Sequence, residues 1–517
     1  MFTIMSATLM ATVAAPLAAA AAAFIVGSRV PRPIGVLGAA AAGLGFLGAV
    51  ALTVAAAGGD PVHAALGPVP LTADRLAVVL LLLVFGVSAI AQAYAVRYLS
   101  GDPRAAWFTG GAGLLTFASA GLMTVDTLIG LAFFWTVAGA ALCLLLATYW
   151  HLPAARDGVR RTVTAFVVGD LALWTAVAVA TATWGRIDLR AIEPGQFSGA
   201  AVSVVAILVV TAALSRSAQI PFHRWLPATL AAPTPVSALL HAGVVNAGGI
   251  LLIRLATLTA DDAARVLTIV AGAATMAYGA LIMLVKPDVK GALVNSTTAQ
   301  MGFMILTCGL GLWAAAVIHL VAHGFYKATL FLSSGSAVAA ARRHEFAPPA
   351  RHLSRGRQAE SGITAVALTG LALGVALAVV GLPAGDHAAE QALLIFAFAT
   401  GTAAMWGWLQ RRPGLGGALG GAAFLIPAAV AYVAIINALS AFLTPALPSS
   451  TLGQPAVWIV TAAVLITLGA LGLTRWAPAA DRLHRTLYVN ALGAGHTPVR
   501  HRVPAESTSA QSAGARS

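Results

Sequence analysis

Long apolar segments, separated by short polar connections, run through almost the whole chain. Each is 19 to 24 residues long, and about 20 apolar residues are enough for an α-helix to cross a bilayer. The pattern therefore predicts an all-α polytopic membrane protein with about 15 transmembrane helices. The expected spans are residues 4–26, 34–57, 76–96, 106–124, 126–148, 162–183, 200–219, 234–257, 264–285, 291–310, 312–332, 362–381, 389–409, 416–439 and 455–474.

Composition supports this class and excludes others. Of the 517 residues, 59% are hydrophobic and 9% are charged, whereas a soluble domain has about 25% charged residues. The two cysteines, Cys143 and Cys308, lie in apolar runs, so a secreted disulfide scaffold is excluded. The net charge of +13 does not indicate a nucleic-acid partner, because the basic residues lie in short connections and form no long patch.

The placement of these basic residues predicts the orientation in the bilayer. The odd-numbered connections, with residues 475–490 after the last span, hold 20 lysines and arginines, whereas the even-numbered connections and the span ends beside them hold 5. Because positive loops stay in the cytoplasm, we expect the N-terminus outside and the C-terminus in the cytoplasm. Residues 1–10 carry no basic side chain, so we expect the first segment to remain a helix and not to be a cleaved signal. Residues 491–517 are expected to form a disordered cytoplasmic tail.

One segment departs from the pattern of a simple spanning helix. Residues 219–235 contain four prolines between two apolar runs. Prolines break helices, and irregular backbone is tolerated at membrane depth only where protein or a water-filled cavity covers it. Broken helices of this kind often lie beside ion paths.

Two charged residues lie in apolar spans on either side of a short connection. Asp170 is in the sixth span and Arg216 is near the end of the seventh. A charge inside the bilayer usually faces the helix bundle and has a partner. We expect an ion pair between them, which either fixes the packing of two helices or supports ion transport.

The strongest local pattern is formed by His319, His323 and Lys327 in the eleventh span. A spacing of four residues places the three side chains on one helical face, about 6 Å apart at each step. Histidine titrates near neutral pH, so such a stripe suits proton transfer. Structural polar packing is the alternative, and zinc chelation by the histidine pair is another. Since no cysteine or carboxylate lies nearby as a third ligand, we expect no metal and no cofactor in this chain. His241 in the eighth span is either a hydrogen-bonded core residue or a further proton carrier.

Three sequence stretches resemble the antiporter-like proton-translocating subunits, the superfamily of complex I subunit 5, Mrp antiporters and membrane hydrogenases. They are residues 215–241, 288–303 and 319–332, and the resemblance covers about residues 70–410. It implies a fold with two inverted five-helix repeats. The expected divisions are N-terminal transmembrane helices at 1–105, an antiporter-like core at 106–410 with repeats at about 106–257 and 264–410, C-terminal helices at 411–490, and the tail at 491–517.

The resemblance also implies a proton path. His241, His319, His323 and Lys327 match the family's path residues, but Thr136 stands where the family has glutamate and Arg216 where it has lysine. No lysine occurs in the twelfth span. These departures do not fit an ordinary complex I pump. Together with residues 240–250 and 487–492, they resemble the DabB family, the membrane subunits of DAB inorganic carbon transporters.

That resemblance implies a non-enzymatic transport subunit in a bacterial inner membrane. It is expected to conduct protons and to energise bicarbonate uptake with a DabA-like partner. The zinc and the CO₂ hydration are expected in the partner. One alternative is a proton-pumping subunit of a redox complex, complex I or a membrane hydrogenase, or an Mrp-type Na⁺/H⁺ antiporter. As a subunit of complex I, the chain would belong to an NADH-quinone oxidoreductase. Another alternative is an assembly scaffold whose proton path has decayed.

Overall fold

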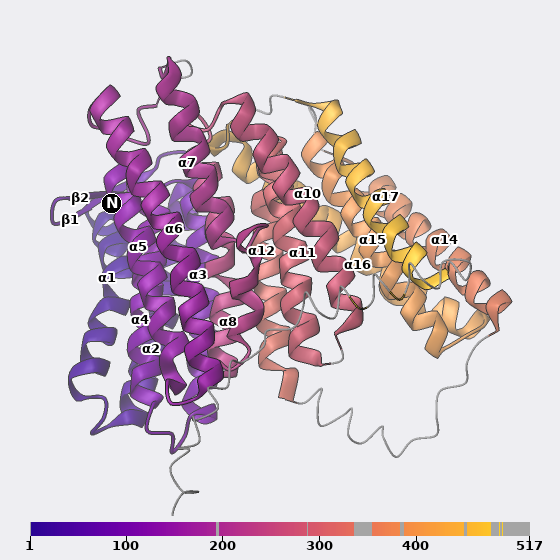
Figure 1. Ribbon diagram of the computed structural model, residues 1–517, viewed down its shortest axis with the longest axis horizontal. Coiled ribbons are helices and arrows are strands. Elements are labelled where there is room, and N and C mark those ends of the chain that lie inside the picture. The colour runs from indigo at the N-terminus through magenta and orange to yellow at the C-terminus, as the bar shows by residue number, and fades with distance from the viewer. Residues whose placement is uncertain are drawn as a thin grey trace, which may run out of the picture.

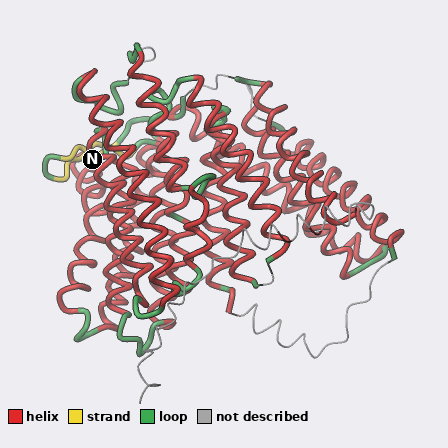
Figure 2. The backbone as a smooth tube through the Cα atoms, viewed as in Figure 1, coloured by secondary structure: helices red, strands yellow, loops and turns green. Residues whose placement is uncertain are grey.

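A computed structural model describes residues 2–192, 196–286, 288–335, 354–382, 387–448 and 452–476, together with Arg485 and Val489. This part of the chain is almost entirely helical (Figure 2), as the apolar pattern predicts. The expected tail at 491–517 lies outside the described residues.

The helices follow one another with short connections. They are α1 (Phe2–Val26), α2 (Pro31–Ala57), α3 (Arg75–Tyr98), α4 (Ala105–Thr124), α5 (Leu128–Leu146), α6 (Pro153–Trp184), α7 (Ala200–Arg216), α8 (Thr234–Ala242), α9 (Ala247–Arg254), α10 (Asp262–Val285), α11 (Val289–Gly309), α12 (Trp313–Leu332), α14 (Arg355–Val380), α15 (Ala388–Arg411), α16 (Leu415–Leu443) and α17 (Gln454–Trp476). The short elements are strands β1 (Val62–Leu66) and β2 (Val69–Ala73) and the 3₁₀ helices η1 (Ala147–Tyr149), η2 (Phe222–Thr229), η3 (Val244–Asn246) and η4 (Thr444–Ala446).

Each expected span coincides with helix, and the chain is a multi-pass membrane protein. Within the described residues, 11 helical segments are long and apolar enough to cross a membrane. They comprise α1, α2, α3, α5, α6, α8 with α9, α10, α12, α14, α15 and α16. The other expected spans correspond to α7 and α17, which are shorter apolar helices, and to α4 and α11, which carry more small and polar residues.

Two of the expected spans are broken helices, and the two breaks lie next to each other. The proline-rich segment breaks the chain as predicted: α7 ends at Arg216, and η2 follows in place of a continuing helix. The eighth span, expected as one helix over 234–257, is also broken. It ends as α8 at Ala242 and resumes as α9 after η3. Asn246 stabilises this second break, since its Nδ2 donates to the carbonyl of Ala242 at 2.7 Å.

A small β-hairpin between α2 and α3 was not expected from the all-α pattern. Strands β1 and β2 pair antiparallel, with Leu66 opposite Val69 across a two-residue turn. Gly67 takes a φ of +62° in that turn, a conformation that glycine adopts without strain. Leu71 forms an isolated bridge with Val125, which joins the hairpin to the connection between α4 and α5. We call the membrane face that carries this hairpin the hairpin face.

Successive groups of helices follow one another along the molecule (Figure 1). Helices α1–α6 form one end, α10–α12 lie in the middle and α14–α17 form the other end. Helices α10 and α11 approach very closely, because a Cβ added at Gly302 would lie 2.3 Å from the backbone nitrogen of Met276. Such small-residue contacts hold membrane helices together by close packing. Helix α12 packs against α8 and α3, and this contact holds the candidate site.

Candidate proton path

Helix α12 carries three titratable side chains into the interior of the protein. His319, His323 and Lys327 are all buried, and Lys327 has no exposed surface at all. The ring centroids of His319 and His323 are 5.9 Å apart, with the rings inclined by only 22°. The structure therefore places these three residues along one buried face, which we call the α12 stripe.

His241 of α8 lies beside the Lys327 end of the stripe. Its ring stacks on Phe331, one turn after Lys327, with centroids 4.4 Å apart and an interplanar angle of 10°. The backbones of α8 and α12 also come close, since a Cβ added at Gly324 would lie 2.9 Å from the carbonyl oxygen of Ala242. The structure thus brings His241 together with the α12 stripe from a separate helix.

Lys327 contacts only neutral oxygen atoms among its described hydrogen-bond partners. Its Nζ donates to the carbonyl of Leu293 at 3.1 Å and to the hydroxyl of Ser296, both on α11. In the described part of the chain, it forms no ion pair with a carboxylate. A buried ammonium without a counter-charge carries a large desolvation cost. This environment is the kind in which an amine exchanges its proton.

Several histidine nitrogens of the site have no hydrogen-bond partner among the described residues. They are Nδ1 and Nε2 of His323, Nε2 of His319 and Nδ1 of His241. A histidine that only fixes packing is normally hydrogen-bonded when buried. These ring nitrogens are therefore available to water and to protons.

Helix α15 covers the other end of the stripe and adds a carboxylate that sequence analysis missed. The ring of Phe396 lies 5.2 Å from that of His319, edge to face, and stacks on Phe303. Glu390 lies six residues earlier on α15, about 9 Å along the helix axis. It is buried, and within the described structure its Oε2 has no partner. The available signal was an acidic residue in the first turn of an apolar helix.

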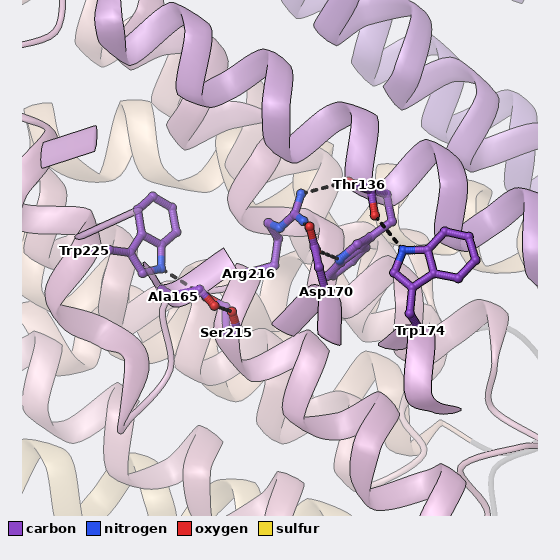
Figure 3. Close-up of polar contacts among 8 residues, drawn as sticks. Thr136, Ala165, Asp170, Trp174, Ser215, Arg216 and Trp225 are labelled. Atoms are coloured by element: carbon purple, nitrogen blue, oxygen red, sulfur yellow. Dashed lines mark hydrogen bonds and ion pairs between the residues drawn. The ribbon is translucent and has the colours of Figure 1, made fainter. Parts of the chain in front are cut away.

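Arg216 and Asp170 form the second polar cluster (Figure 3). Nη2 of Arg216 lies 2.9 Å from Oδ1 of Asp170. The Nη1 group donates to the carbonyl of Trp135 at 3.1 Å, and Nε1 of Trp135 donates to Asp170 at 2.8 Å. The guanidinium also lies over the rings of Trp135 and Phe166, at 4.3 and 4.2 Å from their centroids. These contacts hold Arg216 in one position at the end of α7.

Thr136, which stands where the resemblance implies a glutamate, does not take part in this ion pair. Its hydroxyl accepts a hydrogen bond from Nε1 of Trp174 at 3.0 Å (Figure 3). The carboxylate that faces Arg216 therefore comes from α6 and not from α5.

A small cavity lies between Arg216 and the helix that carries His241. Arg216 lines one side, and Ala242, Gly243 and Asn246 at the break between α8 and α9 line another. Its volume is about 40 Å³, and a single water needs roughly 10–15 Å³. A few water molecules can therefore stand between the ion pair and the helix that carries His241.

No group of three histidine, cysteine, aspartate or glutamate side chains could hold a metal ion within the described ranges. The α12 stripe offers two imidazoles, and its third member is a lysine.

The family models locate this site in a known class of membrane proteins. Residues 126–409 match the family model of the NADH:quinone oxidoreductase/Mrp antiporter transmembrane region. The chain belongs to this family. Residues 67–109 also match the N-terminus of chain 5 of NADH-ubiquinone oxidoreductase, complex I. All the candidate site residues, Asp170, Arg216, His241, His319, His323, Lys327 and Glu390, lie within the antiporter-family match.

The relatives that the chain resembles include an inorganic carbon transporter subunit and a quinone oxidoreductase subunit. The chain is 36% identical over 288 residues to the "Probable inorganic carbon transporter subunit DabB1" of Halothiobacillus neapolitanus, covering 53% of this chain and 51% of that protein. It is 34% identical over 271 residues to NADH-quinone oxidoreductase subunit L of Mycobacterium tuberculosis, covering 51% of this chain and 43% of that protein. The chain thus spans about half the length of these curated relatives.

Among solved structures, the chain is similar to one in the Mrp complex from Dietzia sp. DQ12-45-1b. The TM-score is 0.63 at 24% identity, covering 94% of this chain and 59% of that chain. This similarity supports the antiporter-like fold. The family match over residues 126–409 and the curated relatives show that the chain is an antiporter-like membrane subunit.

Proposed function

We propose that this chain conducts protons as the membrane subunit of an inorganic carbon uptake complex. The observation that carries the proposal is the buried α12 stripe, joined by His241 from α8. Three imidazoles and one amine lie together in the interior of a membrane protein, and the amine has no carboxylate partner among the described side chains. Placing such groups in the bilayer is costly, and they are typically functional.

In this proposal, protons move along the stripe by exchange between neighbouring groups. His323 lies between His319 and Lys327, and its two free ring nitrogens can accept a proton on one side and release it on the other. Water bridges the steps of about 6 Å. Lys327 can hold and release a proton, because its acceptors are a carbonyl and a hydroxyl.

Glu390 extends the path toward the hairpin face. Helices α15 and α12 both begin near this face, and the contact between Phe396 and His319 brings their N-terminal halves together. A buried carboxylate with an unpaired oxygen can take up a proton at the hairpin face and pass it to His319 through water. The proposed order is Glu390, His319, His323, Lys327 and His241, which runs inward from the hairpin face.

Asp170 and Arg216 have a supporting role in this proposal. Arginine does not release its proton under physiological conditions, so Arg216 does not carry protons itself. Its fixed positive charge beside the small cavity sets the electrostatic potential next to the helix that carries His241.

The DabB name of a relative at 36% identity supports inorganic carbon uptake as the coupled process. We propose a DabA-like zinc protein as partner, which hydrates CO₂ while this chain supplies the proton flow. The chain then lies in a bacterial inner membrane with its N-terminus outside and its C-terminus in the cytoplasm. The asymmetry of 20 against 5 basic residues between alternate connections supports this orientation.

A redox complex is the second candidate, favoured by the 34% identity to a subunit of NADH-quinone oxidoreductase. Co-purification separates the two. A tag on this chain should isolate a heteromeric complex with one large zinc-containing partner, and metal analysis should find zinc only when that partner is present. Isolation of this chain with flavin- and iron–sulfur-containing subunits would instead assign it to a redox complex. CO₂ hydration by the chain alone would contradict the division of roles.

A further inference from the structure

The hairpin face carries a polar cavity that the proposed path does not use. Its volume is about 480 Å³, and its lining includes Thr72, Asp74, Arg190, Arg254 and Asp126. Arg254, the last residue of α9, is held against the end of α4, because its guanidinium donates to the carbonyls of Leu122 and Val125. The cavity is therefore a vestibule at the membrane surface that is lined by charged side chains.

A chain of hydrogen bonds leads from the hairpin surface to this vestibule. Nδ1 of His63, on the exposed side of β1, lies 2.9 Å from the hydroxyl of Thr72 on β2. That hydroxyl donates to Oδ2 of Asp126 at 2.5 Å. Asp126 is buried with 8% of its surface exposed, so Thr72 connects a surface imidazole to a buried carboxylate.

The vestibule continues inward to the small cavity beside Arg216. Three helices line both spaces: α3 through Ala77 and then Leu80, α9 through Ile253 and then Ile250, and α4 through Met123. Of the described residues, Met123 is the one that both linings share. It is buried, so its flexible side chain separates the two spaces.

The inner cavity is lined by hydroxyls as well as by Arg216. Ser88 and Thr116 hydrogen-bond to each other at 2.6 Å, and Ser119 lies one turn from Met123 on α4. From Met123 to Thr116 the axial distance is about 10 Å. The cavity wall is otherwise mostly apolar, and these hydroxyls, with Arg216, form its polar side between Met123 and the ion pair.

We infer that His63, Thr72, Asp126 and the two cavities form a proton half-channel from the hairpin face to the Arg216–Asp170 pair, closed at Met123. The inference rests on the proposed proton transport, and it adds an entrance that is separate from the α12 stripe. An imidazolium at His63 gives its Nδ1 proton to the Thr72 oxygen while the Thr72 hydroxyl proton passes to Oδ2 of Asp126. One proton thus moves from histidine to carboxylate, and rotation of the hydroxyl restores the chain.

Cysteine accessibility tests the route independently of transport. In the full chain with Cys143→Ser and Cys308→Ser, Ser119→Cys places a thiol in the inner cavity. Ala118→Cys is its matched control, because Ala118 is the adjacent residue on α4 and packs in the hydrophobic core. Pro68→Cys in the exposed hairpin turn reports which side of a sealed vesicle carries the hairpin face. Silver ion, a small thiol-reactive cation, is the probe, and thiols that remain free are labelled with a maleimide after denaturation.

We expect silver to block Ser119→Cys only from the side on which Pro68→Cys reacts, and several-fold faster than Ala118→Cys. Adding Met123→Ala should accelerate the reaction several-fold, and adding Met123→Trp should slow it to the rate of the control. Equal rates for Ser119→Cys and Ala118→Cys in the Met123→Ala background would overturn the half-channel. So would reaction of Ser119→Cys from the opposite side alone.

A second experiment tests whether the half-channel contributes to proton flux. Asp126→Asn removes the acceptor charge and should lower proton flux several-fold, with the complex still assembled. If the wild-type complex itself moves no protons, the proposed function fails while the silver experiment still decides whether the half-channel exists. Full flux in the assembled Asp126→Asn variant would contradict the role of the hydrogen-bonded chain.

Discussion

At the scale of single residues, two buried basic side chains have opposite surroundings. Arg216 faces a carboxylate, a carbonyl and two aromatic rings, whereas Lys327 faces a carbonyl and a hydroxyl. A compensated guanidinium stays charged and fixed in place. An uncompensated amine can change its protonation state, so the proposed exchange of protons belongs to Lys327.

The Arg216–Asp170 contact predicts a strong coupling between the two side chains. Asp170→Asn keeps a side chain of similar shape but leaves the buried guanidinium without its counter-charge, which should cost about 3 kcal/mol in the free energy of unfolding. Asp170→Asn combined with Arg216→Gln should recover part of this loss. Denaturant titration of the purified chain measures the three variants, and additive effects would mean that the two charges do not interact.

Glu390 gives a second prediction at this scale. Glu390→Gln preserves size but removes the group that takes up a proton, so proton flux should fall severalfold while assembly remains normal. Glu360→Gln is the matched control, because Glu360 is exposed at the start of α14. Flux measured in proteoliposomes decides the question: equal flux in the two variants would remove Glu390 from the path.

Sequence spacing was enough to predict the α12 stripe, because residues at intervals of four share one helical face. It was not enough to find the contacts that Lys327 makes with α11, or the stacking of His241 on Phe331. These depend on which helices become neighbours, and periodicity within one helix carries no such information. Glu390 was missed for the same reason, since its burial depends on the packing of α15.

At the scale of elements, the spacing between α8 and α12 determines whether His241 meets the stripe. Gly324 allows this spacing, because an added Cβ would lie 2.9 Å from the Ala242 carbonyl and 2.5 Å from Leu83 Cδ1. The backbone carbonyl cannot rotate away as a flexible side chain can. The two helices would therefore have to move apart.

Gly324→Ala should consequently lower both stability and proton flux. Overpacking of this kind costs about 1–3 kcal/mol, and the wider spacing should separate His241 from Lys327. Gly374→Ala on α14 is the control, because a Cβ there meets no atom within 4 Å. Thermal denaturation and flux are measured on both. Unchanged values for Gly324→Ala would show that the close contact is not needed.

The sequence predicts one of the two helix breaks more directly than the other. Four prolines in residues 219–235 predict the end of α7 directly. The break between α8 and α9 falls at Gly243, with no proline inside it, and depends on the Asn246 side chain bonding to a backbone carbonyl. Each strand of the β-hairpin has only five residues. In a chain dominated by apolar helices, a pattern of alternating burial over five residues is too short to predict a strand.

At the scale of the whole molecule, the orientation follows from charges in the connections. If the N-terminus is outside, the hairpin face is outside as well, because the hairpin connects the second and third helices. Pro68→Cys should therefore react with a membrane-impermeant maleimide in intact cells. Pro413→Cys, in the exposed connection between α15 and α16, should react only in inverted vesicles. The reverse pattern would invert the proposed orientation and the direction of the proton path.

The central claim is that the α12 stripe carries protons, and proton flux through the assembled complex in proteoliposomes tests it most directly. A potassium diffusion potential drives the flux, and an internal pH dye reports it. Lys327→Ala removes the amine, and Lys327→Arg replaces it with a group that cannot release its proton. Thr329→Ala is the control, since Thr329 lies on the same helix, is exposed and bonds only to the Phe325 carbonyl of its own helix. We predict wild-type flux for Thr329→Ala and only the background flux of protein-free vesicles for both Lys327 variants. Undiminished flux through assembled Lys327→Ala would contradict the account.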